Sequence, residues 1–136
     1  MMIVPKKQEE KIDLYAESSR IALAKMIIRL FQLWNLTTTE QLNLLGLSPK
    51  SRSLLSKYGK GEALPATRDV LDRVGYLLAI HKALMLLFPE NEDLLRSWVK
   101  SRNTAFGGAT PLEVILEQGI VGMARVSRYL DFVRGH

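Results

Sequence analysis

Residues 37–58, TTTEQLNLLGLSPKSRSLLSKY, place the strongest constraint on the fold, because they specify a capped helix and the turn that ends it. Thr37 and Glu40 have the spacing of a capping box, in which the threonine hydroxyl accepts from the Glu40 backbone N–H and the glutamate reaches back. The apolar run that follows predicts a short helix. Gly46 then supplies the residue that most easily adopts the positive φ of a helix-ending turn.

A second, cationic helix follows that turn. Ser48 and Pro49 predict its N-cap and its first residue, with Leu54 and Leu55 facing inward. Residues 48–60 contain four basic side chains and no acid, which accounts for most of the net charge of +5. A short helix, a glycine turn and a cationic helix are typical of a helix-turn-helix, whose second helix enters the major groove of DNA. The predicted DNA-binding residues are Ser48, Lys50, Ser51, Arg52, Ser53, Lys57 and Lys60.

Two alternatives to a regular DNA-binding motif stay open. Capped helix pairs also occur in α-helical proteins that bind no nucleic acid, and a cationic run is also typical of a solvated helix face. Arg52 stands six residues after Gly46, where many helix-turn-helix motifs carry a buried aliphatic residue. Either the turn is a residue or two longer, so that Leu54 takes that place, or the motif is irregular.

Helical periodicity continues on both sides of this pair. Apolar residues from Ile21 to Trp34 recur at spacings of three and four, which predicts a first core helix from Ser18 to Asn35. The longest helical pattern covers residues 66–88, and its second half, GYLLAIHKALMLLF, is apolar on nearly every side. Such a segment must be buried from more than one direction, which predicts that it joins the two halves of the molecule or takes part in an oligomer interface.

Three further helices are marked by their termini. Asn91 is the predicted cap of a helix over residues 92–100, and Thr110 with Glu113 forms a second capping box for residues 112–118. The last helix covers about residues 121–133, with Met123, Val126, Leu130 and Val133 on one stripe. No segment alternates with period two for long enough to predict a strand. The expected fold is all-α, with a helix-turn-helix N-terminal half followed by a small helical C-terminal domain.

The length of 136 residues and the composition limit the possible domain organisation. We expect an N-terminal arm or frayed helix over 1–17, a helix-turn-helix region over 18–65 and a helical binding and oligomerisation domain over 66–136. The absence of cysteine excludes disulfides and cysteine-ligated zinc, and it fits a reducing compartment. No apolar run approaches the ~18 residues of a membrane span, and the N-terminus lacks the order of a signal peptide. These features predict a cytoplasmic protein without a membrane partner.

The residues that usually support catalysis are sparse. The chain has two histidines, and His81, isolated on the apolar helix, is interpreted as a hydrogen-bonded core residue. The Phe106-Gly107-Gly108 segment neither follows a strand nor has the glycine spacing of a phosphate-binding loop. We therefore expect binding rather than catalysis, with no catalytic residue, metal ligand or cofactor.

The C-terminal part combines a phenylalanine before a glycine pair, a Pro-Leu helix start, two more glycines and a final helix with arginine and tyrosine. These features lie at Phe106, Gly107, Gly108, Pro111, Leu112, Gly119, Gly122, Val126 and Tyr129. In this combination the segment closely resembles the toxin-binding domain of Xre/MbcA/ParS-type antitoxins. LLGLSPKSRSLLSKYGKGEALP is similar to the Xre-like helix-turn-helix of the same family. The resemblance covers roughly residue 18 to the C-terminus.

This resemblance implies an antitoxin of a type II toxin–antitoxin operon, partnered with a RES-domain toxin that consumes NAD. The C-terminal region would block the toxin's active site, and the helix-turn-helix would bind operator DNA, as a homodimer or higher oligomer, to repress the operon. The implied toxin-binding residues are Phe106, Arg125, Arg128, Tyr129, Arg134, Gly135 and His136.

Three other interpretations compete with this one. The chain could be a stand-alone helix-turn-helix repressor whose C-terminal half only dimerises. It could be a protein-binding antitoxin with a degenerate helix-turn-helix, for which Arg52 is the best argument. Finally, the last helix could simply cap the core, with its arginines solvated.

Overall fold

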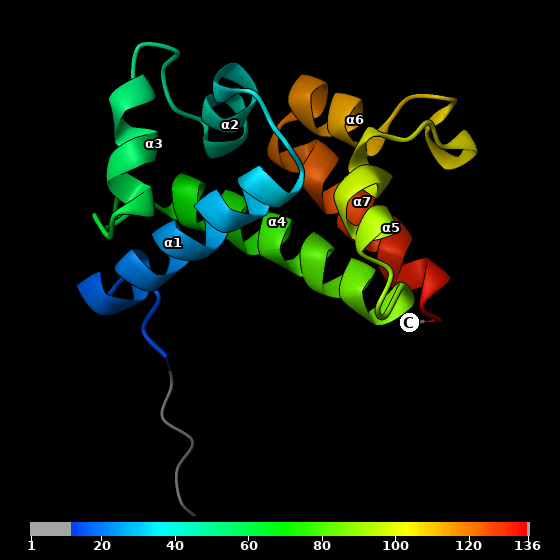
Figure 1. Cartoon of the computed structure of the whole chain (residues 1–136), viewed down its shortest axis with the longest axis horizontal. Helices are drawn as coiled ribbons and strands as arrows, with labels where there is room; N and C mark the ends of the chain where they lie inside the picture. The colour runs from blue at the N-terminus through cyan, green and yellow to red at the C-terminus, as the bar shows by residue number, and fades with distance from the viewer. Residues whose placement is uncertain (1–11, 136) are drawn as a thin grey trace, which may run out of the picture.

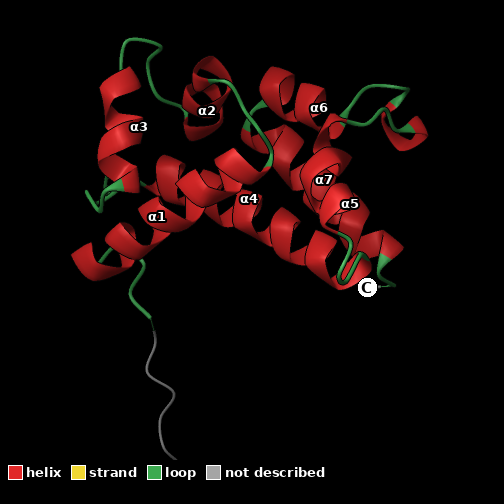
Figure 2. Cartoon of the chain, in the orientation of Figure 1, coloured by secondary structure: helices red, strands yellow, loops and turns green. Residues whose placement is uncertain are grey.

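The computed structural model of the chain describes residues 12–135, which form only helices and the loops between them (Figures 1 and 2). The α-helices are α1 (Glu17–Leu33), α2 (Thr38–Leu45), α3 (Arg52–Gly59), α4 (Arg68–Leu87), α5 (Glu92–Ser97), α6 (Pro111–Gln118) and α7 (Ile120–Val133). Two short 3₁₀ helices, η1 (Trp98–Lys100) and η2 (Thr104–Phe106), lie between α5 and α6. The prediction of an all-α fold is confirmed.

The helix α4 is the central element of the fold. It runs between a group formed by α1, α2 and α3 and a group formed by α5, α6 and α7 (Figure 1). It packs against α1 and α2 on one side and most extensively against α7 on the other. Seven of its side chains are buried, and all belong to one hydrophobic cluster that reaches both groups. The domain boundary at residues 65 and 66 stays a prediction, but α4 serves the cores of both halves.

Both predicted capping boxes are present. The Thr37 hydroxyl accepts from the backbone N–H of Glu40 at 3.1 Å, and the Glu40 carboxylate accepts from the Thr37 N–H at 2.9 Å. At the start of α6 the corresponding distances between Thr110 and Glu113 are 3.0 Å and 3.3 Å. Gly46 ends α2 with φ of +70°, as its position in the sequence predicts.

The start of the second helix differs from the prediction. α3 begins at Arg52, and Ser48 makes a turn before it. The Ser48 carbonyl accepts from the Ser51 N–H at 2.9 Å, and its hydroxyl accepts from the Lys50 N–H at 3.2 Å. Pro49 follows Ser48 in this turn, a position that suits proline as well as the first residue of a helix does. The N-cap role predicted for Ser48 is wrong, and a turn longer than the usual motif is observed.

The apolar second half of α4 is only partly buried. Met85 is 44% exposed and Leu86 is 55% exposed, because α7 covers one side of this helix and leaves another side to solvent. The prediction that this helix joins the two halves of the molecule agrees with its contacts to α1 and α2 and to α7. The alternative, that the segment takes part in an oligomer interface, stays a prediction. On α7, Val133 is 47% exposed, so the predicted apolar stripe is buried only as far as Leu130.

His81 occupies an unusual position on α4. Its Nδ1 atom is buried and has no hydrogen-bond partner among residues 12–135, so the expected hydrogen bond is not observed. Burial lowers the pKa of the imidazole, because the charged form would lose hydration. The neutral form is therefore the one that this site favours.

The N-terminal segment is only partly described. Residues 12–16 are not helical, and the Asp13 carboxylate accepts from the Tyr15 N–H at 2.9 Å in a local turn. Part of the predicted arm or frayed helix, residues 1–11, lies outside the described residues.

Alanine substitutions at two helical glycines are expected to have opposite effects on stability. A Cβ at Gly122 in α7 would lie 2.5 Å from the Val114 carbonyl oxygen in α6, whereas a Cβ at Gly75 in α4 would meet nothing within 4 Å. We expect Gly122→Ala to lower the free energy of unfolding by roughly 1–3 kcal/mol. Gly75→Ala should leave it unchanged or raise it by up to about 1 kcal/mol, since alanine favours helices. Urea unfolding would measure both, and equal effects would contradict the close packing of α6 on α7.

Candidate nucleic-acid interface and partner-binding surface

The predicted DNA-binding residues lie at one end of the molecule, on α3 and on the turns that flank it (Figure 1). Leu55 and Tyr58 face the core, which turns the polar side of α3 outward. Burial raises the pKa of Tyr58, and the nearby Glu62 adds to the effect. Ser51 is half-buried, and the remaining predicted residues are exposed, namely Ser48, Lys50, Arg52, Ser53, Lys57 and Lys60.

The structure adds residues of α1 to this cationic end. Lys25, Arg29 and Gln32 of α1 line a cleft of about 310 Å³ together with Gly59 and Lys60. The sequence-based list of DNA-binding residues leaves out Lys25 and Arg29. Their positive charge was visible in the sequence, but the packing of α1 against α3 is what brings them to the same surface.

An adjoining cleft of about 510 Å³ continues this surface toward the start of α2. Arg52 and Ser56 of α3 line it, as do Thr38 and Gln41 from the first turns of α2. The two clefts thus form one polar, cationic surface that suits a phosphate backbone rather than an apolar ligand.

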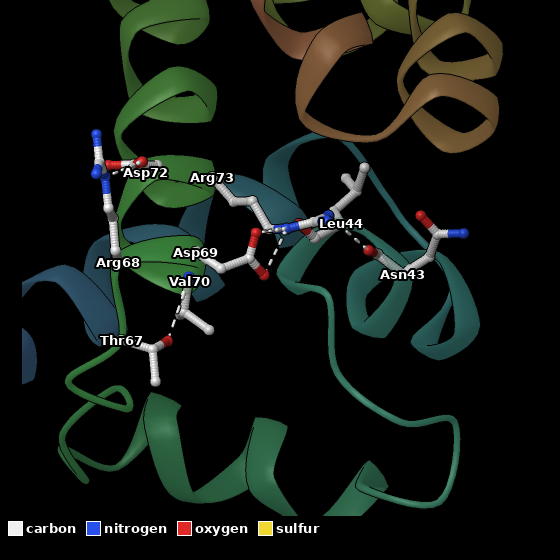
Figure 3. A network of polar contacts seen from close by, with 8 residues as sticks. All are labelled: Asn43, Leu44, Thr67, Arg68, Asp69, Val70, Asp72 and Arg73. Carbon is white, nitrogen blue, oxygen red and sulfur yellow. Dashed lines mark hydrogen bonds and ion pairs between the residues drawn. The ribbon is translucent and has the colours of Figure 1, made fainter.

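Arg73 connects the helix-turn-helix to the C-terminal half (Figure 3). From α4, its Nε donates to the Asp69 carboxylate at 3.1 Å, and its Nη1 points at the carbonyls of Asn43 and Leu44 at 3.4 Å and 3.5 Å. These carbonyls belong to the last turn of α2, where a cation is favourable.

Two turns with positive φ lie beside the Arg73 guanidinium, and the one at Gly46 makes room for it. A Cβ at Gly46 would lie 2.9 Å from its Nε, so only glycine allows this approach together with the φ of +70°. A Cβ at Gly119, between α6 and α7, would lie 3.8 Å from its Nη2. Arg73 therefore lies between the turn of the DNA-binding motif and the turn that opens α7.

The outer face of α7 carries a mixed apolar and cationic stripe. Val121, Arg125, Arg128 and Phe132 follow one another at spacings of four, three and four, which places them on one side of the helix. All four are exposed, with Phe132 at 77% and Val121 at 67%. The sequence-based list contains the two arginines but leaves out Val121 and Phe132, because periodicity alone does not tell which apolar residues lack a neighbour.

Beside this stripe, three aromatic rings pack together. The Tyr129 ring stacks on Trp98 with centroids 6.4 Å apart and meets the edge of Phe106 at 5.2 Å. Phe106 is buried, and the Arg125 guanidinium lies 5.4 Å from the centre of its ring. A direct contact of Phe106 with a toxin stays a prediction. In this structure Phe106 helps to hold the exposed Arg125 side chain in place, because a cation is attracted to the face of an aromatic ring.

The end of the chain holds the remaining predicted toxin-binding residues. Arg134 is half-buried, and its guanidinium lies 3.6 Å from the Asp131 carboxylate. This arginine therefore already has an ion-pair partner within the chain. Gly135 is exposed at the end of the described range, and His136 lies outside it. Of the predicted set, Arg125 and Arg128 are thus the most accessible cations.

Other kinds of site are not indicated within residues 12–135. No cluster of three or more potential metal ligands occurs in this range. None of the helices described there combines the length and the apolar character that crossing a bilayer requires.

Comparison with known proteins identifies both halves. Residues 13–79 match the antitoxin Xre-like helix-turn-helix domain, and residues 83–135 match the antitoxin Xre/MbcA/ParS C-terminal toxin-binding domain. The chain belongs to the Xre/MbcA/ParS antitoxin family. Both matched domains are binding and regulatory rather than catalytic, and together they describe an antitoxin of a toxin–antitoxin system with a DNA-binding domain. The resemblance of the sequence to this family is confirmed.

A relative of similar length supports this assignment over most of the chain. The uncharacterized protein y4oB of Sinorhizobium fredii (strain NBRC 101917 / NGR234) is 37% identical over 122 residues, which cover 88% of this chain and 91% of the relative. Similarity therefore extends across α4 and joins the two matched domains.

Alanine substitutions at two arginines of α4 test whether Arg73 stabilises the contact between the two halves of this antitoxin. The Arg73 side chain is 18% exposed and spans two turns, whereas the Arg68 side chain is 87% exposed and only approaches Asp72 at 3.6 Å. We expect Arg73→Ala to lower the free energy of unfolding by about 1–2 kcal/mol. Arg68→Ala should cost less than about 0.5 kcal/mol, as exposed ion pairs do. Urea unfolding of both variants measures the difference, and equal values would contradict a structural role for Arg73.

Proposed function

We propose that this antitoxin neutralises a RES-domain toxin that consumes NAD, by blocking the toxin's active site with its C-terminal region, and represses its own operon through operator DNA. The observation that carries the proposal is the presence of two separate exposed cationic surfaces, one on α1 and α3 and one on α7, within the matched domains. Because operator DNA is the second ligand, we place the protein in the cytoplasm.

DNA binding would use the end of the molecule that carries α3. In a helix-turn-helix the second helix enters the major groove with its N-terminal residues toward the bases. Arg52 and Ser53 occupy that position here, and Lys50 precedes them in the turn. Lys57, Lys60, Lys25 and Arg29 are further from the start of α3 and suit phosphates, which position a protein without reading sequence.

The salt dependence of operator binding tests this arrangement. Lys57, Lys60, Lys25 and Arg29 on phosphates predict that log K falls with log salt at a slope of about −3.6 per half-site, and the slope would be only about −1.8 if Lys25 and Arg29 made no contact. Lys25→Ala and Arg29→Ala should each reduce the steepness by about one unit without changing sequence preference. Lys50→Ala with Arg52→Ala should abolish specific binding. Fluorescence anisotropy with the promoter region of the operon measures all of these.

A matched pair of cations on the other half serves as the control. Arg96 and Arg102 are exposed and line neither of the two clefts, so Arg96→Ala with Arg102→Ala should leave the slope unchanged. If that pair weakened operator binding as much as Lys50→Ala with Arg52→Ala, net charge rather than the α3 surface would explain the affinity.

Toxin binding would use the stripe on α7. Arg125 and Arg128 can form charge-assisted hydrogen bonds at a pocket shaped for a polar dinucleotide, and Val121 and Phe132 can bury apolar area beside them. Arginine and aromatic residues are the side chains most enriched in the energetic centres of interfaces. Tyr129, Arg134 and the terminal Gly135 and His136 would complete the contact at the end of the helix.

Reversal of the charges on α7 tests the toxin contact. We expect Arg125→Glu with Arg128→Glu to abolish copurification with the neighbouring gene product and the rescue of growth on co-expression. The same variant should keep its circular dichroism and its operator affinity, because neither arginine is needed by the core. Arg96→Glu with Arg102→Glu is the charge-matched control and should neutralise the toxin normally.

The possible outcomes separate this proposal from its competitors. Retained neutralisation by the α7 variant would contradict the role of the stripe, and a deletion of residues 134–136 would then test the tail alone. If the unaltered chain formed no complex with its neighbour while still binding its promoter, the protein would be a stand-alone repressor.

A further inference from the structure

A third cleft, of about 440 Å³, lies where the end of α1 meets α5 and η1. One of its walls belongs to the helix-turn-helix half and the other to the C-terminal half. We refer to it as the α1–α5 cleft. Apart from Gln32, no residue that lines it also lines the two clefts beside α3, and none belongs to the stripe on α7. The surfaces proposed for DNA and toxin therefore leave the α1–α5 cleft unassigned.

The turn that ends α1 forms one wall of the cleft. Asn35 has φ of +52°, and its N–H donates to the Gln32 carbonyl at 3.0 Å. The Leu36 N–H donates to the Phe31 carbonyl, also at 3.0 Å. These two bonds are a Schellman motif, in which asparagine can take the place of glycine. The Asn35 carbonyl accepts from the Lys100 ammonium of η1 at 2.6 Å, so a direct contact joins the two walls.

The opposite wall carries two cations without an acidic partner. Arg96 and Lys100 stand four residues apart on α5 and η1, a spacing that places them on one side of the helix. Both are exposed, and neither forms an ion pair with another residue of the range 12–135. No acidic residue of this range lines the α1–α5 cleft. Its positive charge therefore favours an anionic ligand.

The α1 side of the cleft combines apolar and amide groups. Leu33 is half-buried and Trp34 is 1% exposed, and both line the cleft. The side chains of Gln32 and Asn35 are exposed, and each amide offers donors and an acceptor, as pairing with a peptide backbone requires. A nucleic-acid phosphate offers acceptors only and would gain nothing from Leu33. The combination fits an acidic peptide segment that carries an aliphatic side chain.

We propose that the α1–α5 cleft binds an acidic peptide segment of a partner protein other than the toxin. Its carboxylates would pair with Arg96 and with Lys100, whose ammonium has three donors and uses one of them on the Asn35 carbonyl. Its aliphatic side chain would contact Leu33. The occupant would thus touch both halves of the antitoxin. The proposal depends neither on the toxin contact nor on operator binding, so its failure would leave the proposed function intact.

Fluorescence anisotropy with the full chain tests the charge requirement. The probe is a fluorescein-labelled peptide of sequence EEDLEE, and we expect its binding to saturate. Arg96→Glu should raise the dissociation constant about tenfold or more, because an attractive charge pair becomes a repulsive one. Arg102→Glu is the matched control, since it changes the net charge equally at an exposed residue that does not line the cleft. It should change the dissociation constant less than about twofold, because salt screens distant charges.

Two further ligands test the rest of the recognition. The peptide EEDSEE keeps the charge of the probe and should bind about tenfold more weakly, since burial of the leucine side chain is lost. An oligothymidine of six nucleotides has a similar charge but neither a peptide backbone nor a leucine. At physiological salt it should not displace the labelled peptide.

The two tryptophans of the chain locate the bound peptide. Trp34 lines the cleft, whereas Trp98 stacks on Tyr129 and does not line it. Their indole N–H resonances can be assigned with a Trp98→Phe variant. Unlabelled EEDLEE should shift the Trp34 resonance more than the Trp98 resonance.

Several outcomes would overturn the proposal. They are the absence of saturable binding, equal weakening by Arg96→Glu and Arg102→Glu, equal affinities for EEDLEE and EEDSEE, and a larger shift of the Trp98 resonance. Displacement of the peptide by oligothymidine that is lost in Arg96→Glu would also overturn it, and would identify the α1–α5 cleft as a phosphate-binding surface.

Discussion

The burial of α4 between two groups of helices is the constraint on which the rest of the structure depends. Its inward side changes along its length, from Val70, Leu71 and Val74 near the helix-turn-helix to Ile80, Ala83 and Leu84 near α7. Its buried side chains belong to the same hydrophobic cluster as those of both groups, and α7 is the helix it contacts most. A disturbance of α4 is therefore expected to affect both halves at once.

In this arrangement the residues proposed to bind DNA or toxin are different from the buried residues that stabilise the fold. The cationic face of α1 and α3 and the stripe on α7 consist of exposed residues on helices whose other side is buried. Substitutions there can change one interaction without unfolding the chain. Arg73 is the exception, since it contacts α2 and lies beside the turns at Gly46 and Gly119.

Local sequence signals predicted much of the fold because capping and glycine turns act over three or four residues. Thr37 with Glu40, Thr110 with Glu113, and Gly46 all have the predicted geometry. The start of α3 was mispredicted because Ser48 and Pro49 suit a β-turn as well as a helix start, and local chemistry does not choose between them. The Nδ1 of His81 lacks the expected partner because side-chain hydrogen bonding depends on residues distant in sequence.

The amino-acid sequence is sufficient to predict the helical class, the helix ends that carry caps, the family and the cationic character of α3. The packing of the helices is needed to learn which apolar residues remain exposed, such as Phe132 and Leu86, and which distant charges share a surface, such as Arg29 and Lys60. The physical reason is that periodicity fixes the face of a helix on which a residue lies. The packing of other helices decides whether that face is covered.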